Sequence, residues 1–318
     1  MEGTLGLRLD QDRIGSFRSF SHRELGIREA FVQPRIGGAR TVGVLSTPID
    51  AAPTGGWVIC HSFALEQVYL QPLETALARA MAAAGHAVLR FHGQGYGDSD
   101  RGTEHASLRS HVDDARDAAG VLAEEAGVER IGFAGLRLGG TVATLAADEA
   151  RAAGLVAAAP AIDGSNYMGW MTKQARLTAV STGEEALPDD PVAELMAAGT
   201  LDVLGFPLRR EVYDEISSLD VLGALRGFRG EALVLQVSRS GDPDPDLERL
   251  AERLWGLGAR VDLHVLEDPA ALRLGLPRYR RSKQGRKEDT QGGLSERVVA
   301  AVAAWSRDRR WQGAAVGS

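Results

Sequence analysis

The residues with the clearest chemical meaning lie in a glycine-flanked turn between an apolar strand pattern and a helix pattern. Residues 133–147 read FAGLRLGGTVATLAA, and the turn at 135–139 reads GLRLG. This spacing is that of a nucleophile elbow, G-x-S-x-G, in which a serine at the tip attacks the substrate. Here the tip residue is Arg137. A guanidinium stays protonated at physiological pH and has no free electron pair, so Arg137 cannot perform covalent acyl chemistry.

An arginine at the tip of such a turn has a different use. The elbow directs its tip side chain into the pocket, and the amide of Leu138 and the helix start near Gly140 face the same place. A helix N-terminus attracts anions, and a guanidinium adds two parallel hydrogen-bond donors. The turn therefore predicts a site for a carboxylate, phosphate or enolate oxygen. The competing interpretation is that Arg137 pairs with Asp242 or Asp163 and fills an inactive site.

The elements that must position this turn follow from the hydrophobic pattern. After residue 25, short apolar runs alternate with helical patterns, and Gly37-Gly38 marks a hairpin between the first two runs. Strands are expected at 29–36, 41–49, 56–63, 86–95, 129–135, 154–162, 231–238 and 260–266, and helices at 71–86, 107–127, 140–150, 246–258 and 295–308. This alternation predicts an α/β fold with a mostly parallel sheet between two layers of helices.

One long stretch interrupts the alternation. Residues 164–225 contain methionines, a tryptophan and a GFPL turn at 205–208, without a strand–helix repeat. An insertion near the carboxyl ends of parallel strands lies where ligands bind, so this one is expected to be a cap. The predicted organisation is an N-terminal arm at 1–25, an α/β core at 26–163 and 226–318, and a cap at 164–225.

Composition narrows the function classes. The net charge of −7 and the pI near 5.6 do not favour a nucleic-acid-binding protein, because binding nucleic acid needs a positive surface. No run approaches 18 apolar residues and the first residues do not resemble a signal peptide, so a cytoplasmic protein without a membrane span is expected. The single cysteine, Cys60, excludes an internal disulfide and fits a reducing compartment.

No metal or cofactor is expected, and a homodimer is left open. The basic segment 273–287 is expected to be a solvated loop or a contact for an acidic ligand or partner.

Four motifs resemble one known fold family. They are HSFALEQ at 61–67, FHGQGYGDSD at 91–100, GLRLGG at 135–140 and APAIDGSNY at 159–167. Over about residues 30–310 the chain resembles the α/β-hydrolase fold. It is most similar to the exosortase-A-associated hydrolases of the second type, which also carry a G-L-R-L-G turn, a P-x-x-D-G and a G-[FY]-P-L segment. The resemblance implies that the loop with Ser62 and Phe63, together with the amide of Leu138, supplies N–H groups for an oxyanion or ligand.

The remaining members of a serine-hydrolase triad are a base and an acid that orients it. The acid is expected in RSGDPDPD after the strand at 231–238, where Asp242 or Asp244 fills the position or else forms a turn and a helix cap. The base is expected in the loop after 260–268, which contains no histidine. His264 lies four residues too early, inside the strand. With nucleophile and base both missing, a conventional Ser-His-Asp hydrolase is not expected.

Other residues are candidates for a displaced site. Cys60 ends a buried strand and is either core or a nucleophile. Ser62 lies beside His61, although adjacent side chains of an extended loop point apart. His92 opens the glycine loop after the next strand, and His61 and His92 at neighbouring strand ends could form an acid/base or metal pair.

Three functions are therefore compared. The first is an α/β-hydrolase-like protein with a degenerate triad that binds an acyl or carboxylate small molecule and acts on it, if at all, without hydrolysis. The second is an esterase or thioesterase with a displaced nucleophile, Ser62 or Cys60, served by His61 or His92. The third is a pseudoenzyme that serves as an interaction protein, with a filled elbow pocket.

Overall fold

A nine-stranded sheet forms the centre of the computed structural model, which describes residues 18–182, 187–267, 279–281, 287–289 and 292–308. In spatial order the strands are β1 (Ser19–His22), β2 (Ile27–Val32), β5 (Gly43–Pro48), β7 (Ala87–Phe91), β6 (Gly56–Cys60), β8 (Ile131–Leu136), β9 (Gly154–Ala158), β12 (Glu231–Ser238) and β13 (Arg260–Glu267). The strands from β7 to β13 are parallel, and β1, β2 and β5 add an antiparallel edge. The predicted mostly parallel sheet is confirmed.

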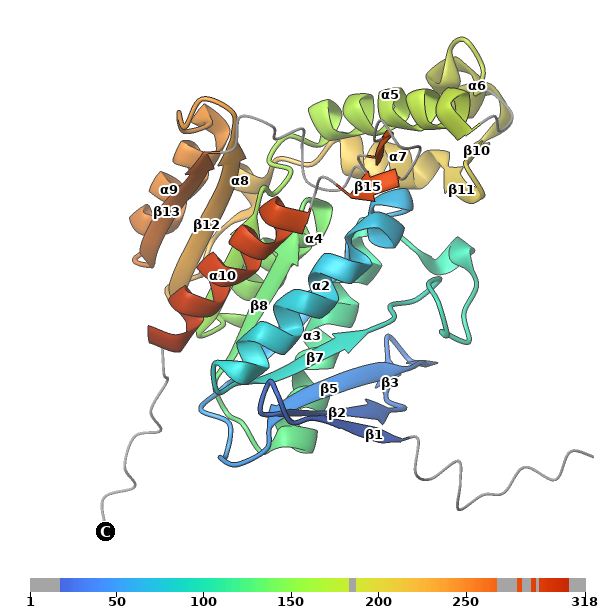
Figure 1. Cartoon of the computed structure of the whole chain (residues 1–318). Helices are drawn as coiled ribbons and strands as arrows, with labels where there is room; N and C mark the ends of the chain where they lie inside the picture. The colour runs from blue at the N-terminus through green and yellow to red at the C-terminus, as the bar shows by residue number, and fades with distance from the viewer. Residues whose placement is uncertain (1–17, 183–186, 268–278, 282–286, 290–291, 309–318) are drawn as a thin grey trace, which may run out of the picture.

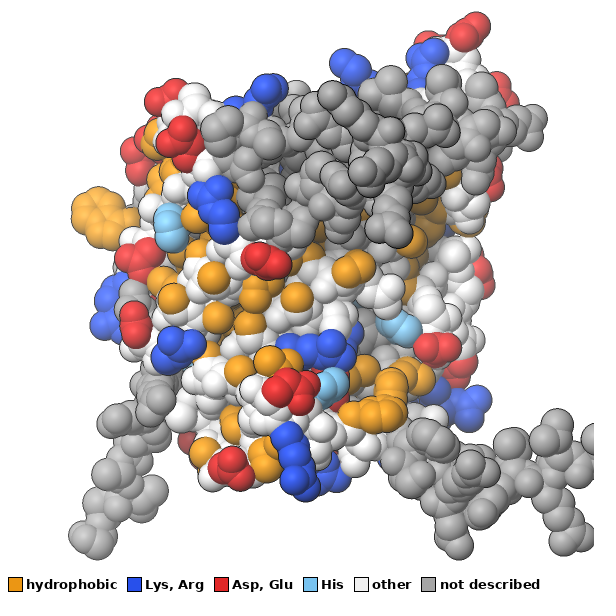
Figure 2. Space-filling model, in the orientation of Figure 1, with side chains coloured by type: hydrophobic (Ala, Val, Ile, Leu, Met, Phe, Trp, Pro, Cys, Tyr) orange, Lys and Arg blue, Asp and Glu red, His pale blue; other side chains and the backbone are white. Residues whose placement is uncertain are grey.

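Helices cover both faces of the sheet (Figure 1). The helices α2 (Leu65–Ala83) and α10 (Gly292–Asp308) pack on one face, and α3 (Leu108–Ala126), α4 (Leu138–Ala150) and α9 (Pro245–Gly256) pack on the other. Where α2 and α10 face outward, small hydrophobic side chains are interspersed with charged ones (Figure 2). The two hydrophobic clusters on either side of the sheet therefore hold the elbow strand β8 from both faces.

The helix α2 begins earlier than the sequence pattern indicated. Its first residue is Leu65 rather than the expected residue 71, and Pro72 lies inside the helix. Proline is frequent in the first turn of a helix, but Pro72 is the eighth residue of α2. The buried side chains of Glu66 and Leu70 belong to the added turns, so packing at the end of β6 outweighs the hydrogen bond that Pro72 cannot donate.

The insertion between β9 and β12 lies over the carboxyl ends of the parallel strands (Figure 1). It contains α5 (Gly164–Thr182), α6 (Pro191–Ala198), β10 (Thr200–Val203), β11 (Phe206–Arg209), α7 (Arg210–Ser217) and α8 (Val221–Ala224). The GFPL segment belongs to a tight β10–β11 hairpin, with Leu204 and Gly205 both at positive φ. The turn expected at 205–208 is therefore a two-residue turn at Leu204 and Gly205, which Gly205 permits, and Phe206 begins the second strand.

The last residues of the expected N-terminal arm form a strand. Residues 18–25 are part of the sheet edge, where β1 pairs with β2 and His22 Nε2 lies 2.8 Å from Glu29 Oε2, while residues 1–17 lie outside the described residues. Most of the basic segment 273–287 also lies outside them; β14 (Tyr279–Arg281) and β15 (Lys287–Asp289) form a short antiparallel pair. Among the described helices, none is long and apolar enough to cross a membrane.

Candidate functional site

The predicted elbow is present between β8 and α4. Arg137 alone links strand and helix, with φ 55° and ψ −125°, a conformation that an L-residue rarely adopts. A Cβ on Gly139 would lie 2.3 Å from the carbonyl oxygen of Cys60, and a Cβ on Gly135 would lie 2.1 Å from that of Gly139. Both glycines are therefore required by the close approach of helix and strand.

The partner of Arg137 is Glu66 in the first turn of α2. Arg137 Nε donates to Glu66 Oε1 at 3.0 Å, and the two side chains are 12% and 5% exposed. The second carboxylate oxygen accepts a hydrogen bond of 2.8 Å from the hydroxyl of Tyr167. The expected pairing of Arg137 with Asp242 or Asp163 was wrong, because α2 follows β6, the direct neighbour of β8, and its first turn lies nearer to the elbow.

Aromatic side chains of α5 cover the guanidinium. The Trp170 ring lies 4.4 Å from Arg137 Cζ and the Tyr167 ring 5.9 Å from it, both within the range of cation–π attraction. Burial raises the pKa of Tyr167 well above its usual value, so the hydroxyl keeps its proton and donates to Glu66. Within the described residues, the two terminal amino groups of Arg137 have no hydrogen-bond acceptor.

These terminal groups border a pocket of about 260 Å³. Its walls are mixed and come from the loop after β9, the start of α5, the end of β12 and the start of α9. The apolar lining residues are Ala159, Pro160, Ala161, Ile162, Val237 and Leu247, and Asn166 and Gln236 are polar ones. Arg137, Tyr167 and Trp170 complete one side. No serine, cysteine or histidine is among the described residues that line this pocket.

Three aspartates also line the pocket, and each has a partner in the first turns of a helix. Asp163 accepts from the third amide along the chain at 2.7 Å, Asp244 caps α9 through the amide of Asp246, and Asp246 pairs with an arginine of the same helix. Asp242 is exposed and does not line the pocket. Its loop is fixed by Gln236, whose side chain donates to the carbonyl of Asp242 and accepts from the amide of Asp244.

The candidates for a displaced nucleophile are in the core. Ser62 Oγ donates to the carbonyl of Leu136 at 2.6 Å and accepts from the amide of Gly139 at 3.3 Å, so it fastens the elbow from beneath. Cys60 is buried, and burial raises the pKa of its thiol. Phe63 and Leu138 are each 1% exposed and do not line the pocket, contrary to their expected role as ligand-facing donors.

The structure brings His61 and His92 to one pocket, but not to the elbow pocket. Both line a cavity of about 290 Å³ between α2 and the strands β5 and β7. His61 Nδ1 donates to the carbonyl of Ser62 at 2.9 Å and its Nε2 accepts from the amide of Gly93 at 3.3 Å. Burial, followed by the neighbouring His111, lowers the pKa of His61 to about 3, so it is neutral.

The other histidines have local partners or are exposed. His92 Nδ1 accepts from the amide of Asp98 at 3.0 Å, and His264 is exposed on β13 as expected. Among the described residues, no group of three or more histidine, cysteine or acidic side chains could hold a metal ion.

Glu66, Tyr167 and Trp170 were not recognised from the sequence. Glu66 lies in HSFALEQ, a motif already noted, and an acidic residue in the first turn of a helix that begins beside an elbow is the signal that could have identified it. Tyr167 and Trp170 are three residues apart, which places them on one helical face.

Comparison with solved structures shows the fold. An esterase from Pyrococcus furiosus superposes with a TM-score of 0.62 at 15% identity, covering 92% of this chain and 95% of that chain. Est1E from Butyrivibrio proteoclasticus, solved with ferulic acid bound, gives a TM-score of 0.55 at 17% identity, covering 87% of this chain and 98% of that chain. Brefeldin A esterase, described as a bacterial homologue of human hormone-sensitive lipase, gives a TM-score of 0.56 at 18% identity, covering 90% of this chain and 78% of that chain.

The profile of the serine aminopeptidase S33 family matches residues 58–195. The chain has the α/β-hydrolase fold. The mostly parallel central sheet flanked by helices is the fold class that the sequence predicted. No curated protein sequence matches the chain.

Proposed function

We propose that this α/β-hydrolase-fold protein binds the acyl or carboxylate group of a small molecule at Arg137 and does not perform serine-hydrolase chemistry. The observation that carries the proposal is the pocket itself: Arg137 occupies the tip of the elbow, and the described lining holds no serine, cysteine or histidine. A pocket in which one cationic donor lies beside apolar and polar side chains fits a small molecule that presents a carboxylate or carbonyl to Arg137 and a short apolar part to the wall.

The orientation of the guanidinium supports this ligand class. Glu66 uses the Nε edge of Arg137, and Trp170 covers its face. The remaining edge carries both terminal amino groups, which is the edge that binds a carboxylate through two parallel hydrogen bonds. Because Glu66 already offsets part of the charge, and the aspartates of the lining repel anions, we expect selectivity to come from hydrogen-bond geometry and from contacts with the apolar lining residues.

A displaced-nucleophile esterase is less compatible with the geometry. The hydroxyl of Ser62 donates its hydrogen bond to the backbone carbonyl of Leu136. The neighbouring His61 ring donates to the backbone carbonyl of Ser62, so it does not accept a proton from the Ser62 hydroxyl. The thiol of Cys60 is buried, and its raised pKa keeps it protonated and unreactive.

A non-catalytic interaction protein is the second candidate, and one observation favours it. The Glu66–Arg137 pair is complete without a ligand, and the Leu138 amide is buried beneath it. A site of this kind would be a structural replacement for the lost nucleophile, and it would bind no small molecule.

Titration with carboxylates separates the two candidates. Butyrate, hexanoate and octanoate would be added to wild-type protein while tryptophan fluorescence is followed, because Trp170 lines the pocket. We expect saturable binding that is at least tenfold weaker in Arg137→Met. The matched control is Arg210→Met, which removes an exposed arginine of α7 and should bind as wild type does. Absence of saturable binding, or equal binding by Arg137→Met, would contradict the proposal.

We further infer that the chain belongs with the exosortase-A-associated hydrolases of the second type. The support is the sequence of three segments, GLRLG at 135–139, Asp163-Gly164 and GFPL at 205–208. All three are near the elbow pocket or in the insertion above it.

A further inference from the structure

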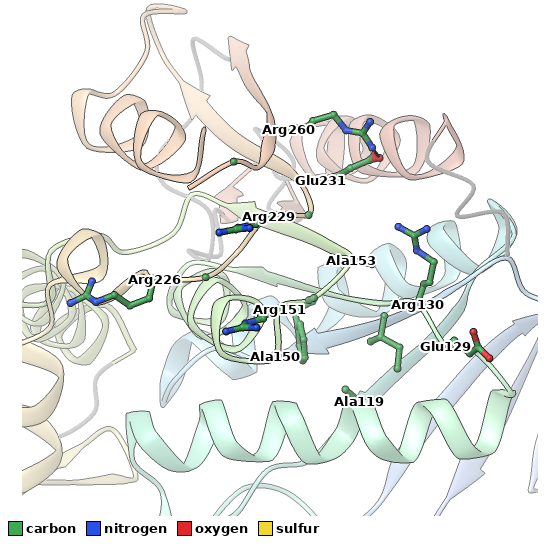
Figure 3. Close-up of a pocket in the computed structure, with 16 residues that line it drawn as sticks. Ala119, Glu129, Arg130, Ala150, Arg151, Ala153, Arg226, Arg229, Glu231 and Arg260 are labelled. Atoms are coloured by element: carbon green, nitrogen blue, oxygen red, sulfur yellow. Dashed lines mark hydrogen bonds and ion pairs between the residues drawn. The ribbon is translucent and has the colours of Figure 1, made fainter. Parts of the chain in front are cut away.

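A second, larger cleft lies at the opposite end of the sheet. Its volume is about 880 Å³, and it is bordered by the starts of β8, β12 and β13, the end of α4 and the segment before β12 (Figure 3). The strand β8 runs from this cleft at Ile131 to the elbow at its other end. The two sites are therefore separate, and nothing in the elbow chemistry explains the larger one.

Arginines dominate the lining of this cleft. Arg151 and Arg229 lie on one side and Arg130 on the other, with Arg226 farther out (Figure 3). None of these four forms an ion pair with any described residue. The fifth arginine, Arg260, is paired with Glu231. In a chain with net charge −7, a cleft lined by five arginines and only two acidic residues, Glu129 and Glu231, is a local reversal of sign.

The segment that carries two of these arginines is firmly held. The buried carboxylate of Asp148 accepts hydrogen bonds from three successive amides, those of Arg226, Gly227 and Phe228, at 2.7–3.0 Å. Directly after it, the amide of Glu231 donates to the carbonyl of Ala153 at 3.0 Å. Arg226 and Arg229 therefore project from a fixed backbone rather than from a free loop.

Helix ends do not account for the cluster. Arg151 is the C-cap of α4 at φ 49°, a position where glycine is usual and a cation complements the helix dipole. Arg130 and Arg229 precede strands, where no such dipole needs a cation. Between the arginines, the floor consists of small or apolar side chains: Ala119, Ile131, Phe133, Ala150, Ala152 and Ala153.

We propose that this cleft binds an organic molecule carrying two or more phosphate groups. Guanidinium groups bind phosphate oxygens in pairs, and a phosphate monoester carries more charge at neutral pH than a carboxylate does. Guanidinium groups on two sides of the cleft suit a ligand with more than one anionic group, and the apolar floor suits its organic part. The volume lies within the range of small-molecule sites.

Calorimetric titration of the full chain with ATP, without divalent cations and at low salt, tests this proposal. We expect saturable binding that weakens at least tenfold in Arg130→Gln/Arg229→Gln and weakens as salt is raised. The control, Arg28→Gln/Arg40→Gln, makes the same change of net charge at exposed positions of β2 and β4 (Ala39–Arg40) and should bind as wild type does.

Three further probes define the ligand class. AMP should bind at least fivefold more weakly than ATP because it has one phosphate, and tripolyphosphate should bind more weakly than ATP because it lacks the organic part. Arg137→Met should bind ATP normally, which separates this site from the elbow pocket.

The proposal is overturned if ATP does not bind, if the two double variants lose binding equally, or if a hexaglutamate peptide binds more tightly than ATP. Equal affinity for tripolyphosphate and ATP would remove the assigned role of the apolar floor.

Discussion

The Glu66–Arg137 ion pair makes the elbow dependent on a charge match that a double-mutant cycle can measure. Removing the guanidinium in Arg137→Met leaves the Glu66 carboxylate only 5% exposed, with the Tyr167 hydroxyl as its remaining partner. Breaking a buried pair from one side costs about 3–5 kcal/mol, because an uncompensated charge stays buried. Glu66→Gln should cost less, about 1–3 kcal/mol, because Arg137 borders the pocket and reaches water there.

The coupling follows from the geometry of the pair. At the 3.0 Å separation of Nε and Oε1, Coulomb's law with an effective dielectric constant near 20 gives roughly 5 kcal/mol of attraction. Loss of hydration offsets part of this, so the Glu66→Gln/Arg137→Met double variant should be more stable than additivity predicts by about 2 kcal/mol.

Urea unfolding followed by circular dichroism at 222 nm measures the four proteins of the cycle. The exposed Arg210–Asp214 pair of α7, separated by 3.5 Å, is the matched control, and its coupling should be about 0.3–0.5 kcal/mol. A coupling at Glu66–Arg137 no larger than that of the control would show that this pair does not organise the elbow.

Three other results are expected. Burial raises the pKa of Glu74 to about 8, so folding favours its protonated form. The stability of the wild type relative to Glu74→Gln should therefore fall as the pH rises from about 4.5 to 8, by on the order of 3 kcal/mol near pH 7. Urea titrations at several pH values measure this difference. Burial lowers the pKa of His61 to about 3 and that of His111 to about 4, so the free energy of unfolding should be retained above pH 6.5 and fall below it. In His111→Gln the free energy of unfolding should fall less steeply between pH 6.5 and 4, and an unchanged slope would contradict the prediction. Asp148→Asn leaves one acceptor oxygen for the amides that Asp148 now binds and should cost about 1–3 kcal/mol, measured against wild type, with weaker ATP binding in the same variant.

Local sequence patterns predicted the scaffold because each signal was contained in a few neighbouring residues. The strands expected at 231–238 and 260–266 are β12 and β13, which are apolar runs bounded by turn residues. The elbow was predictable because its two glycines are needed sterically at fixed spacing. The start of α2 was missed because Pro72 suggests a first turn, and only packing in three dimensions shows that the helix begins earlier.

The chemistry of the site was less predictable because it depends on contacts between distant segments. Glu66 and Arg137 are 71 positions apart and meet only because β6 and β8 are neighbours in the sheet. Asp242 fitted the local pattern of an acid after a strand, yet its side chain faces solvent. The arginines of the large cleft are scattered from residue 130 to residue 260, so no local motif marks them.

Turnover of p-nitrophenyl esters is the most direct test of the claim that the elbow no longer performs acyl transfer. Wild type, Arg137→Ala and Ser62→Ala would be assayed with acetate, butyrate and octanoate esters beside a protein-free blank. We expect no turnover above the blank for any of the three. Turnover by the wild type that is lost in folded Ser62→Ala would contradict it and establish a displaced-nucleophile hydrolase.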